Sequence, residues 1–520
     1  MSSLGSGADY YEADILEATE RDAGDAVAAG DTVSAGDAVA AGDAVAAGDT
    51  DASLPPSGGA SGRAAWVVAD QGLSSLTNFA LTLLVLRNVS TTAFGAYTIA
   101  YTAYVFAVSI SRALGGEPQL VRHSHAPSAV WRQATGETTG TALTLGLVGI
   151  ALFLCTLPVL HHFGRELQIT GRCLVALGIF LPALLVQDAW RYAFFAAGQP
   201  RRAFYNDLVW AVLQGLLLLV VFERGDPSAV MFLVAWGAAA VGGALFGLLQ
   251  TRVLPRPQHT WRWLKRHRDL GPRFTIEFVA ERGSVQLVLF LVAAISGLAV
   301  VAQINVSRVV FGPLNLLLLG VIGFAVPEGV RLWRTRPERL EPFLWLIGAV
   351  LAVSSTAMGA FFYFLPIHDG VRVFGSSWPA VRPLLPWVTL MVAAIALMQG
   401  WRVGLRVHAA ARESLLVRGL TGVAILGAGA VGALLDGAMG FSIALALVML
   451  VAAVASWWQF RVVNTAQLRL RAEIPPGSAT PPDAGPAAKR RFPKTRGVRV
   501  RAAHAAPQRG RGRGSAQPTP

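Results

Sequence analysis

The chain has 520 residues, of which 53% are hydrophobic and only 14% are charged, with a formal net charge of +13. Soluble domains carry about 25% charged residues, so this composition excludes an ordinary water-soluble fold and predicts a protein that crosses a membrane many times. Two cysteines in the whole chain also exclude a disulfide scaffold and provide no zinc-ligand spacing.

The N-terminal segment differs from the rest of the chain. Residues 1–62 are acidic and carry a six-residue repeat of the form Ala-Gly-Asp-Ala-Val-Ala, with Gly-Asp recurring at positions 24, 30, 36, 42 and 48. A hexapeptide period can indicate a β-helix, but these repeats are too few to bury a core. Low apolar bulk and dense like charge favour a disordered, low-complexity acidic tail.

The middle of the chain consists of about twelve apolar runs, each long enough to cross a bilayer as a helix. They lie near residues 64–86, 93–114, 138–160, 172–190, 203–222, 229–251, 274–296, 298–325, 342–366, 380–400, 413–434 and 438–460. Pro182 and Pro313 fall inside two of the runs and predict bends there, because proline removes a backbone hydrogen bond. The predicted fold class is an all-α polytopic membrane protein with two six-helix bundles.

The charges of the loops predict how these helices are oriented. Alternate loops are rich in arginine, and positive residues mark the cytoplasmic side, so we expect both termini in the cytoplasm and the chain in the cell membrane. The basic loop at 254–273 separates six helices from six. The predicted domains are the tail 1–62, an N-terminal bundle 63–253, the loop 254–273, a C-terminal bundle 274–463 and a tail 464–520.

The C-terminal tail is rich in proline and arginine, with Arg-Gly runs near 509–513. Such runs occur in RNA-binding tails, whereas basic clusters beside a membrane bind anionic lipids at about 1 kcal/mol per charge. Because this tail follows a transmembrane helix, the lipid interpretation is favoured. We therefore expect anionic membrane lipids, and no nucleic acid, as its partners.

A short sequence motif that recurs in the second half of the chain suggests that the two bundles are related. Ala69-Asp70-Gln71-Gly72 in the first helix is matched by Ala280-Glu281-Arg282-Gly283 in the seventh, and Glu117 is matched at the same offset by Glu328. Parallel repeats related by an axis along the membrane normal are typical of transporters that bind substrate between their halves. The pattern favours a duplication of this kind.

The sequence contains no constellation for catalysis. It lacks a phosphate-binding glycine loop with lysine, a metal-ligand cluster and a nucleophile elbow. We therefore expect a protein that is not an enzyme and needs no cofactor or metal.

Ionisable residues inside the predicted helices are the strongest functional signal, because an intramembrane charge is costly without a partner or a task. Those considered are Asp70, Arg112, Asp188, Arg191, Asp207, Glu277, Glu281, Arg282 and Arg308. The simplest interpretation is local pairing of Asp70 with Arg112, of Asp188 with Arg191, and of Glu281 with Arg282 or Arg308. Glu277 and Glu281 lie one helical turn apart, which would also suit a shared proton at a coupling site.

One stretch resembles a known family. The run from Asp70 to Phe79, followed by Arg87 to Tyr97 with its Phe94-Gly95 pair, resembles the opening of polysaccharide-export flippases of the O-antigen and teichoic-acid export type. These belong to the multidrug/oligosaccharidyl-lipid/polysaccharide (MOP) exporter superfamily. The resemblance implies a flippase for polysaccharide biosynthesis that moves a polyprenyl-diphosphate-linked glycan across the cytoplasmic membrane by alternating access.

The arginines suit such a substrate, because the planar guanidinium donates paired hydrogen bonds to phosphate. The site hypothesis assigns Arg308, Arg282, Arg112 and Asn78 to substrate binding, and Asp70, Glu277, Glu281 and Asp188 to ion coupling or gating. One alternative is a proton- or sodium-coupled exporter of small molecules. Another is a non-transporting membrane scaffold that recruits glycan assembly enzymes, which are possible partners in either case.

Overall fold

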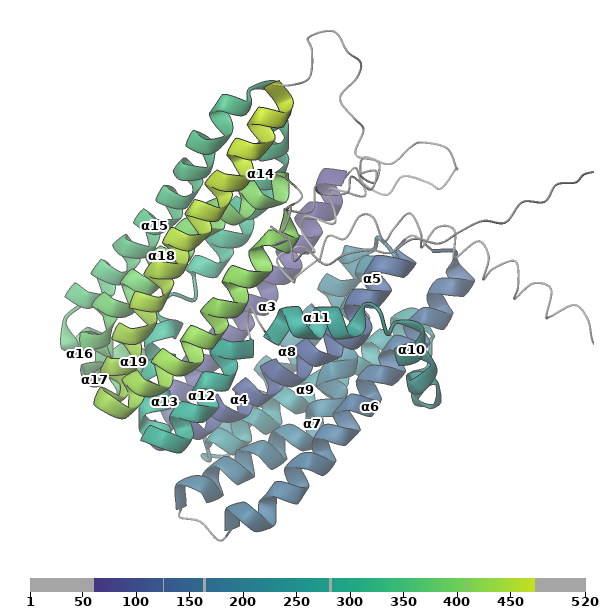
Figure 1. The fold of residues 1–520 in the computed structure, drawn as a ribbon. Helices are drawn as coiled ribbons and strands as arrows, with labels where there is room; N and C mark the ends of the chain where they lie inside the picture. The colour runs from purple at the N-terminus through teal and green to yellow at the C-terminus, as the bar shows by residue number, and fades with distance from the viewer. Residues whose placement is uncertain (1–59, 125, 162–164, 280–282, 409, 473–520) are drawn as a thin grey trace, which may run out of the picture. The chain divides into compact units, whose positions relative to one another are not determined.

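The computed structural model describes residues 60–124, 126–161, 165–279, 283–408 and 410–472, and these ranges form helices and turns without a strand. Most of the two predicted tails, residues 1–59 and 473–520, lies outside these ranges. Residues 60–62 and 464–472 are helical, so the predicted disordered tails are wrong over these stretches, where the helices run on past the apolar residues. Figure 1 shows the helices, which in the first half of the chain are α3 (Ala60–Asn88), α4 (Thr91–Ser111), the π-helix η2 (Arg112–Gly116), α5 (Glu117–His123), α6 (Ser128–His161), α7 (Arg165–Ala196), α8 (Pro200–Glu223) and α9 (Ala229–Thr251).

The second half of the chain follows a short linker. The linker contains the 3-10 turn η3 (Pro257–His259), α10 (Thr260–Arg266) and α11 (Gly271–Phe278). The remaining elements are α12 (Ser284–Ser296), α13 (Leu298–Val309), α14 (Leu314–Thr335), η5 (Pro337–Arg339), α15 (Leu340–Phe364), α16 (Ile367–Phe374), α17 (Trp378–Val381), η6 (Arg382–Leu384), α18 (Leu385–Val407) and α19 (Ala411–Ala472). The helix α19 is interrupted at Asp436 and Gly437, whose backbone angles are not helical, so it consists of two helices joined at a kink.

These helices form the predicted all-α membrane fold with its two bundles. Eight helices of the described ranges are long and apolar enough to span a membrane, and the bent α19 counts as one of them. Each of the twelve predicted runs falls on α3, α4, α6 to α9, α11 with α12, α13 with α14, α15, α18, or one of the two halves of α19. The bend predicted at Pro313 separates α13 from α14, whereas α7 continues through Pro182.

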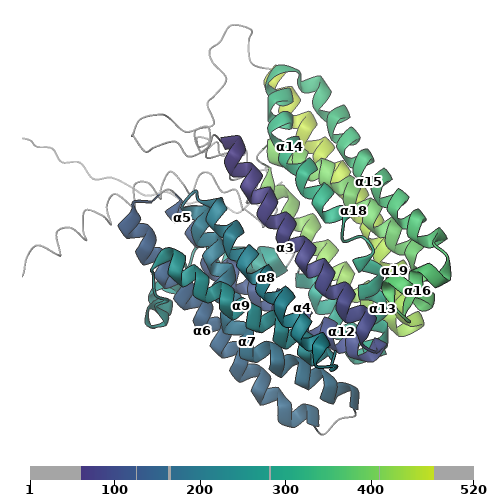
Figure 2. The same ribbon diagram turned by 180° about the vertical axis from the view of Figure 1, so that it is seen from behind.

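Each bundle has its own set of packed helices. In the N-terminal bundle, α7 packs against α4, α6 and α9, and α8 packs against α3 and α9. In the C-terminal bundle (α12–α19), α18 packs against α15 and α19. The long helix α3 also touches α14 and α16, and Figure 2 shows it from the side on which it lies nearest the viewer.

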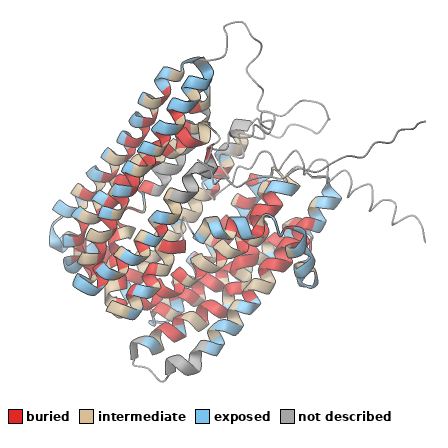
Figure 3. Ribbon diagram, viewed as in Figure 1, coloured by how far each residue is buried: buried red, intermediate tan, exposed pale blue. Residues whose placement is uncertain are grey.

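The outer surfaces of the helices are apolar, as a lipid-facing surface should be. Buried residues follow the sides on which helices meet, and exposed residues follow the opposite sides (Figure 3). Large apolar side chains such as Leu249 and Leu435 are 72% and 80% exposed. Soluble monomers rarely expose broad apolar surfaces, so this pattern supports a multi-pass membrane protein.

The two bundles meet closely where α4 crosses the start of α13. A Cβ atom on Gly95 would overlap the carbonyl group of Leu298, so only glycine permits this approach. Nearby, the side-chain amide of Asn305 donates to the hydroxyl of Thr98 at 3.1 Å. Gly95 belongs to the Phe94-Gly95 pair that carried the family resemblance, and its structural task is this contact.

Replacing Gly95 with alanine is therefore expected to destabilise the protein by about 1–3 kcal/mol, the usual cost of adding a methyl group to a well-packed site. Thermal unfolding of the detergent-solubilised protein measures this. Gly215→Ala on α8 is the matched control, because a Cβ there would meet no atom within 4 Å. Equal melting temperatures for both variants would contradict the assigned contact.

The predicted basic loop folds back onto the N-terminal bundle. Trp263 of α10 is fully buried, and its indole nitrogen donates to the carbonyl oxygen of Leu114 in the π-helix at 2.9 Å. Arg122 forms an ion pair of 2.6 Å with Asp269. A π-helix leaves irregular backbone at a point often used for function. In this protein the π-helix begins at Arg112, and the Trp263 side chain of the linker packs against it and donates a hydrogen bond to it.

Candidate functional site

A polar cavity of about 340 Å³ lies between the two bundles. Helices α3, α4, η2, α7 and α8 line one wall, and α11, α12 and α13 line the other. The lining residues are Ser74, Asn78, Tyr101, Tyr104, Val105, Val108, Ser109, Arg112, Gln187, Asp188, Arg191, Trp210, Phe278, Val285, Gln286 and Arg308. We call this the central cavity.

The first charged element of the cavity wall is the pair formed by Arg112 and Asp188. The Arg112 guanidinium donates two parallel hydrogen bonds to this carboxylate, from Nε at 2.8 Å and from Nη2 at 2.6 Å. Such a two-point pair fixes the arginine in orientation as well as in position. Arg112 also lies over the ring of Tyr192, 5.7 Å from its centroid. The side chain is thus held at the cavity wall and stays 24% exposed.

Behind this pair, Arg191 of α7 gathers three carboxylates. Its Nη2 donates to Oδ2 of Asp70 at 2.7 Å. Its Nε lies 3.4 Å from Asp207 and its Nη1 lies 3.7 Å from Asp188. All four side chains are at most 7% exposed. Gln187 completes the cluster by donating to Asp207 at 2.7 Å.

The positions of these charges follow from helix packing. Asp70 of α3 and Asp207 of α8 both reach Arg191 of α7 because α3 and α7 each pack against α8. Arg112, which directly follows α4, meets Asp188 because α4 packs along α7. The predicted pair of Asp70 with Arg112 is therefore wrong. The predicted pairing of Asp188 with Arg191 occurs only at 3.7 Å, and the closer partner of Asp188 is Arg112.

The opposite wall carries a cation in a different setting. Arg308 lies in the last turn of α13 and lines the cavity from the side of the C-terminal bundle. No hydrogen bond or ion pair joins its guanidinium to another residue in the described ranges. The two walls thus differ: the arginines of the N-terminal wall are held by carboxylates, and Arg308 is available to a ligand.

The structure brings several of the predicted site residues together. Arg308, Arg112, Asn78 and Asp188 line the central cavity, and Asp70 lies directly behind it. Glu277 lies on α11, and its side chain is outside the description. Glu281 and Arg282 fall outside the described residues.

Other residues of the cavity had no predicted role. Arg191 was expected to be locally paired and Asp207 was left without a function, yet both belong to the buried cluster. Tyr101 and Tyr104 form part of an aromatic wall with Trp210. These two tyrosines are three residues apart on α4 and therefore lie on one face of the helix. This spacing could have predicted that they line a common surface.

The two acids of the predicted repeat have unlike surroundings. Glu117 is buried and accepts a hydrogen bond from Tyr192 at 3.2 Å. Glu328 is partly exposed and accepts from Arg331, three residues later, at 2.8 Å. Sequence position alone therefore does not give the two acids a common role.

Known proteins share this fold. No family model and no curated protein match the sequence. A solved inward-facing multidrug-resistance MATE-family transporter of the MOP superfamily matches with a TM-score of 0.59 at 13% identity, over 76% of this chain and 95% of that one. The lipid II flippase MurJ in an inward closed conformation matches with a TM-score of 0.58 at 8% identity, over 79% and 93%. An outward-facing MATE transporter matches at 0.51 and 13%, over 78% and 96%. The chain thus has the fold of MOP-superfamily transporters.

Proposed function

We propose that this protein is a membrane transporter of the MOP type that flips a glycan linked to a polyprenyl diphosphate across the cytoplasmic membrane. The observation that carries the proposal is the position of Arg308, a cation that faces the central cavity without a partner among the described residues. A charge at membrane depth is costly unless it meets an opposite charge. A diphosphate supplies that charge and accepts the paired hydrogen bonds of a guanidinium.

The remaining lining fits the part of the substrate next to the diphosphate. The amides of Asn78 and Gln286 can donate to and accept from sugar hydroxyls, and Tyr101 and Trp210 offer apolar ring faces. A volume of about 340 Å³ lies near the lower end of the 300–1,000 Å³ typical of ligand pockets. We therefore assign only the diphosphate and the first sugar to this cavity, with the rest of the glycan outside it.

The buried carboxylate cluster has a different part in the proposal. Asp188 orients Arg112, and Asp70 and Asp207 hold Arg191. These contacts lie within the N-terminal bundle, so the bundle can move as a body while its charges stay paired. Asp70 and Asp188 are then gating or supporting residues, and the predicted coupling role of Glu277 and Glu281 stays a prediction.

A coupled exporter of small molecules is the second candidate. One carboxylate oxygen of Asp70, Oδ1, is fully buried and has no hydrogen-bond partner among the described residues. A proton or a sodium ion could occupy that position, which is what ion coupling requires. The MATE transporter that shares the fold is described as a multidrug resistance protein. In this candidate Arg308 would have no direct part in transport.

A flipping assay on the reconstituted full-length protein separates these two functions. Proteoliposomes receive a fluorescent polyprenyl-diphosphate sugar in one experiment and a fluorescent cationic dye under a proton or sodium gradient in another. The proposal predicts translocation of the lipid-linked sugar and none of the dye. Dye transport without lipid flipping would establish the second candidate instead.

The scaffold alternative needs its own experiment, because it assigns the activity to the basic tail. Deletion of residues 473–520, which leaves α19 whole, is expected to leave flipping within about twofold of the intact chain, since none of the cavity residues lies there. Loss of glycan assembly in cells with flipping unchanged in proteoliposomes would support a recruiting role for the tail.

A further inference from the structure

Two tyrosines of α4 line the central cavity with hydroxyl groups that bond to nothing in the described part of the protein. Tyr101 and Tyr104 both belong to the cavity lining. Neither hydroxyl oxygen is buried, and neither has a hydrogen-bond partner within the described ranges. The hydroxyl of Tyr97, one turn earlier on the same helix, is by contrast buried and lies outside the cavity lining. Two neutral groups that can each donate and accept a hydrogen bond are therefore open to a ligand.

Packing against a neighbouring helix holds both tyrosine rings in place. Trp236 of α9 is 1% exposed and lies edge-on to Tyr104, with ring centroids 4.7 Å apart and planes at 89°. The same indole lies 5.9 Å from the ring of Tyr101, and the two tyrosine rings are also 5.9 Å apart. These separations fall within the range of about 4.5–7 Å in which aromatic pairs attract each other. The rings, and with them the hydroxyl groups, are therefore positioned before a ligand arrives.

The tyrosines lie at the level of Arg308 along the cavity. Thr98 of α4 accepts a hydrogen bond from Asn305 of α13, and the close approach of the two helices described above precedes this bond along both of them, so they run in the same direction. Tyr101 comes three residues, close to one helical turn, after Thr98. Arg308 comes equally far after Asn305. A group bonded directly to a diphosphate at Arg308 therefore reaches the tyrosines.

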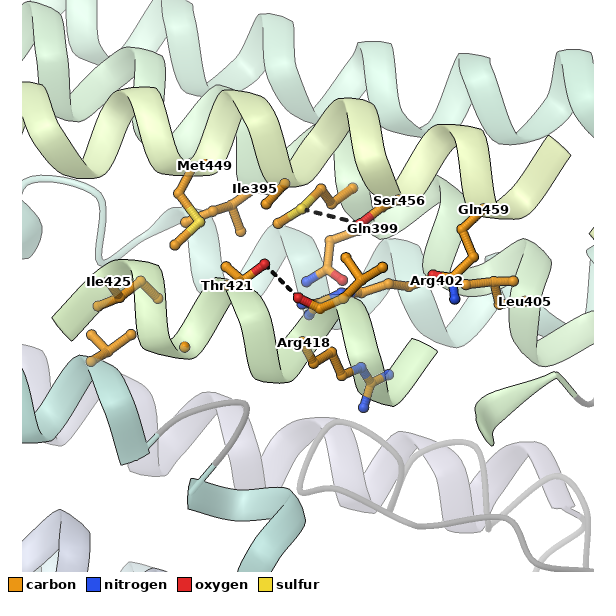
Figure 4. A pocket seen from close by; sticks show the side chains of 15 residues that line it. Ile395, Gln399, Arg402, Leu405, Arg418, Thr421, Ile425, Met449, Ser456 and Gln459 are labelled. Atoms are coloured by element: carbon orange, nitrogen blue, oxygen red, sulfur yellow. Dashed lines mark hydrogen bonds between the residues drawn. The ribbon is translucent and has the colours of Figure 1, made fainter. Parts of the chain in front are cut away.

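A second cavity, inside the C-terminal bundle, has a different lining (Figure 4). Its volume is about 240 Å³, and residues of α18 and of both halves of α19 form most of its wall. None of the described residues that line it is aromatic. Of these two cavities, the central one is thus the one that combines aromatic rings with hydroxyl groups.

We propose that Tyr101 and Tyr104 bind the first sugar of the lipid-linked glycan and make the protein select a glycosylated over a bare polyprenyl diphosphate. This inference rests on the proposed function. The hydroxyl groups of a sugar donate and accept hydrogen bonds, as a tyrosine hydroxyl does, and its C–H groups pack against an aromatic ring. A bare diphosphate lacks these groups, and a site built to bond a substrate hydroxyl discriminates against a ligand without it.

Native mass spectrometry of the full-length protein in a non-ionic detergent tests this selectivity. The probes are a bare polyprenyl diphosphate and the same lipid carrying one sugar, either glucose or N-acetylglucosamine, supplied in equal amounts. The wild type is expected to retain a sugar-bearing lipid at least about fivefold more than the bare lipid, because each hydrogen bond between uncharged groups contributes about two- to tenfold. Tyr101→Phe combined with Tyr104→Phe keeps both rings and is expected to abolish this preference. Tyr97→Phe, which removes a hydroxyl from the same helix outside the cavity lining, is the matched control and is expected to preserve it.

The possible results separate this inference from the proposed function on which it rests. No preference in the wild type, or the same preference in the wild type and the double variant, would overturn the assignment of the sugar to the tyrosines and leave the diphosphate site intact. An equal loss of the bare and the sugar-bearing lipid in the double variant would also overturn it, because the hydroxyl groups would then bind the diphosphate. Binding of neither lipid by the wild type would contradict the proposed function itself, and this inference with it.

Discussion

Replacing Arg308 with glutamine is expected to reduce flipping of a polyprenyl-diphosphate sugar by about 10- to 100-fold at sub-saturating substrate. A hydrogen bond to a charged group contributes about 1.5–3 kcal/mol, and Arg308 is the cavity cation that no described residue engages. The variant should fold normally, because it loses no ion pair within the described ranges. Initial rates in proteoliposomes, normalised to the amount of reconstituted protein, measure the effect.

Two further substitutions show whether charge or geometry is responsible. Arg308→Lys keeps the charge and loses the planar fork, so an intermediate rate is expected. Arg87→Gln, at the exposed C-terminal end of α3, removes an arginine outside the cavity and should leave the rate unchanged. If the Arg308→Gln variant flipped the lipid-linked sugar at the wild-type rate, this residue would not bind the diphosphate.

Replacing Arg191 with leucine is expected to cause the largest loss of stability among single substitutions in the N-terminal bundle. The side chain is 7% exposed, and its removal would leave Asp70 and Asp207 buried without their cation. Breaking a buried ion pair by removing one partner costs about 3–5 kcal/mol. Thermal unfolding of the purified protein in detergent measures the loss.

A double variant distinguishes this explanation from simple loss of packing. Arg191→Leu with Asp70→Leu removes both members of the 2.7 Å pair, so part of the lost stability should return. Arg331→Leu is the control, since this arginine lies in a largely exposed pair with Glu328 and should change the melting temperature little. A double variant less stable than the sum of its two single variants would contradict the pairing.

The sequence predicted the fold in detail because its signals are local. Apolar length marks each span without knowledge of its neighbours, and the twelve runs correspond to helices of the described ranges. The turn at Pro313 is local as well. The uninterrupted course of α7 through Pro182 depends on packing, because Gly146 of α6 lies against that proline.

The site was only partly predictable, because ion pairs between helices depend on which helices touch. The cost of an intramembrane charge identified Asp70, Arg112, Asp188 and Arg308 correctly as unusual residues. It could not assign partners, since the hydrogen bond from Arg191 to Asp70 joins residues 121 positions apart. The hydrogen bond from Trp263 to Leu114 in the π-helix could not be predicted for the same reason, because the two residues are 149 positions apart in the sequence.

The central claim is that a diphosphate binds between the two bundles beside Arg308. The most direct test is an electron cryo-microscopy structure of the full-length protein with a polyprenyl-diphosphate sugar. The account predicts phosphate density in the central cavity, with oxygen atoms about 2.7–2.9 Å from the guanidinium nitrogens of Arg308. An empty central cavity with the diphosphate bound elsewhere on the protein would contradict it.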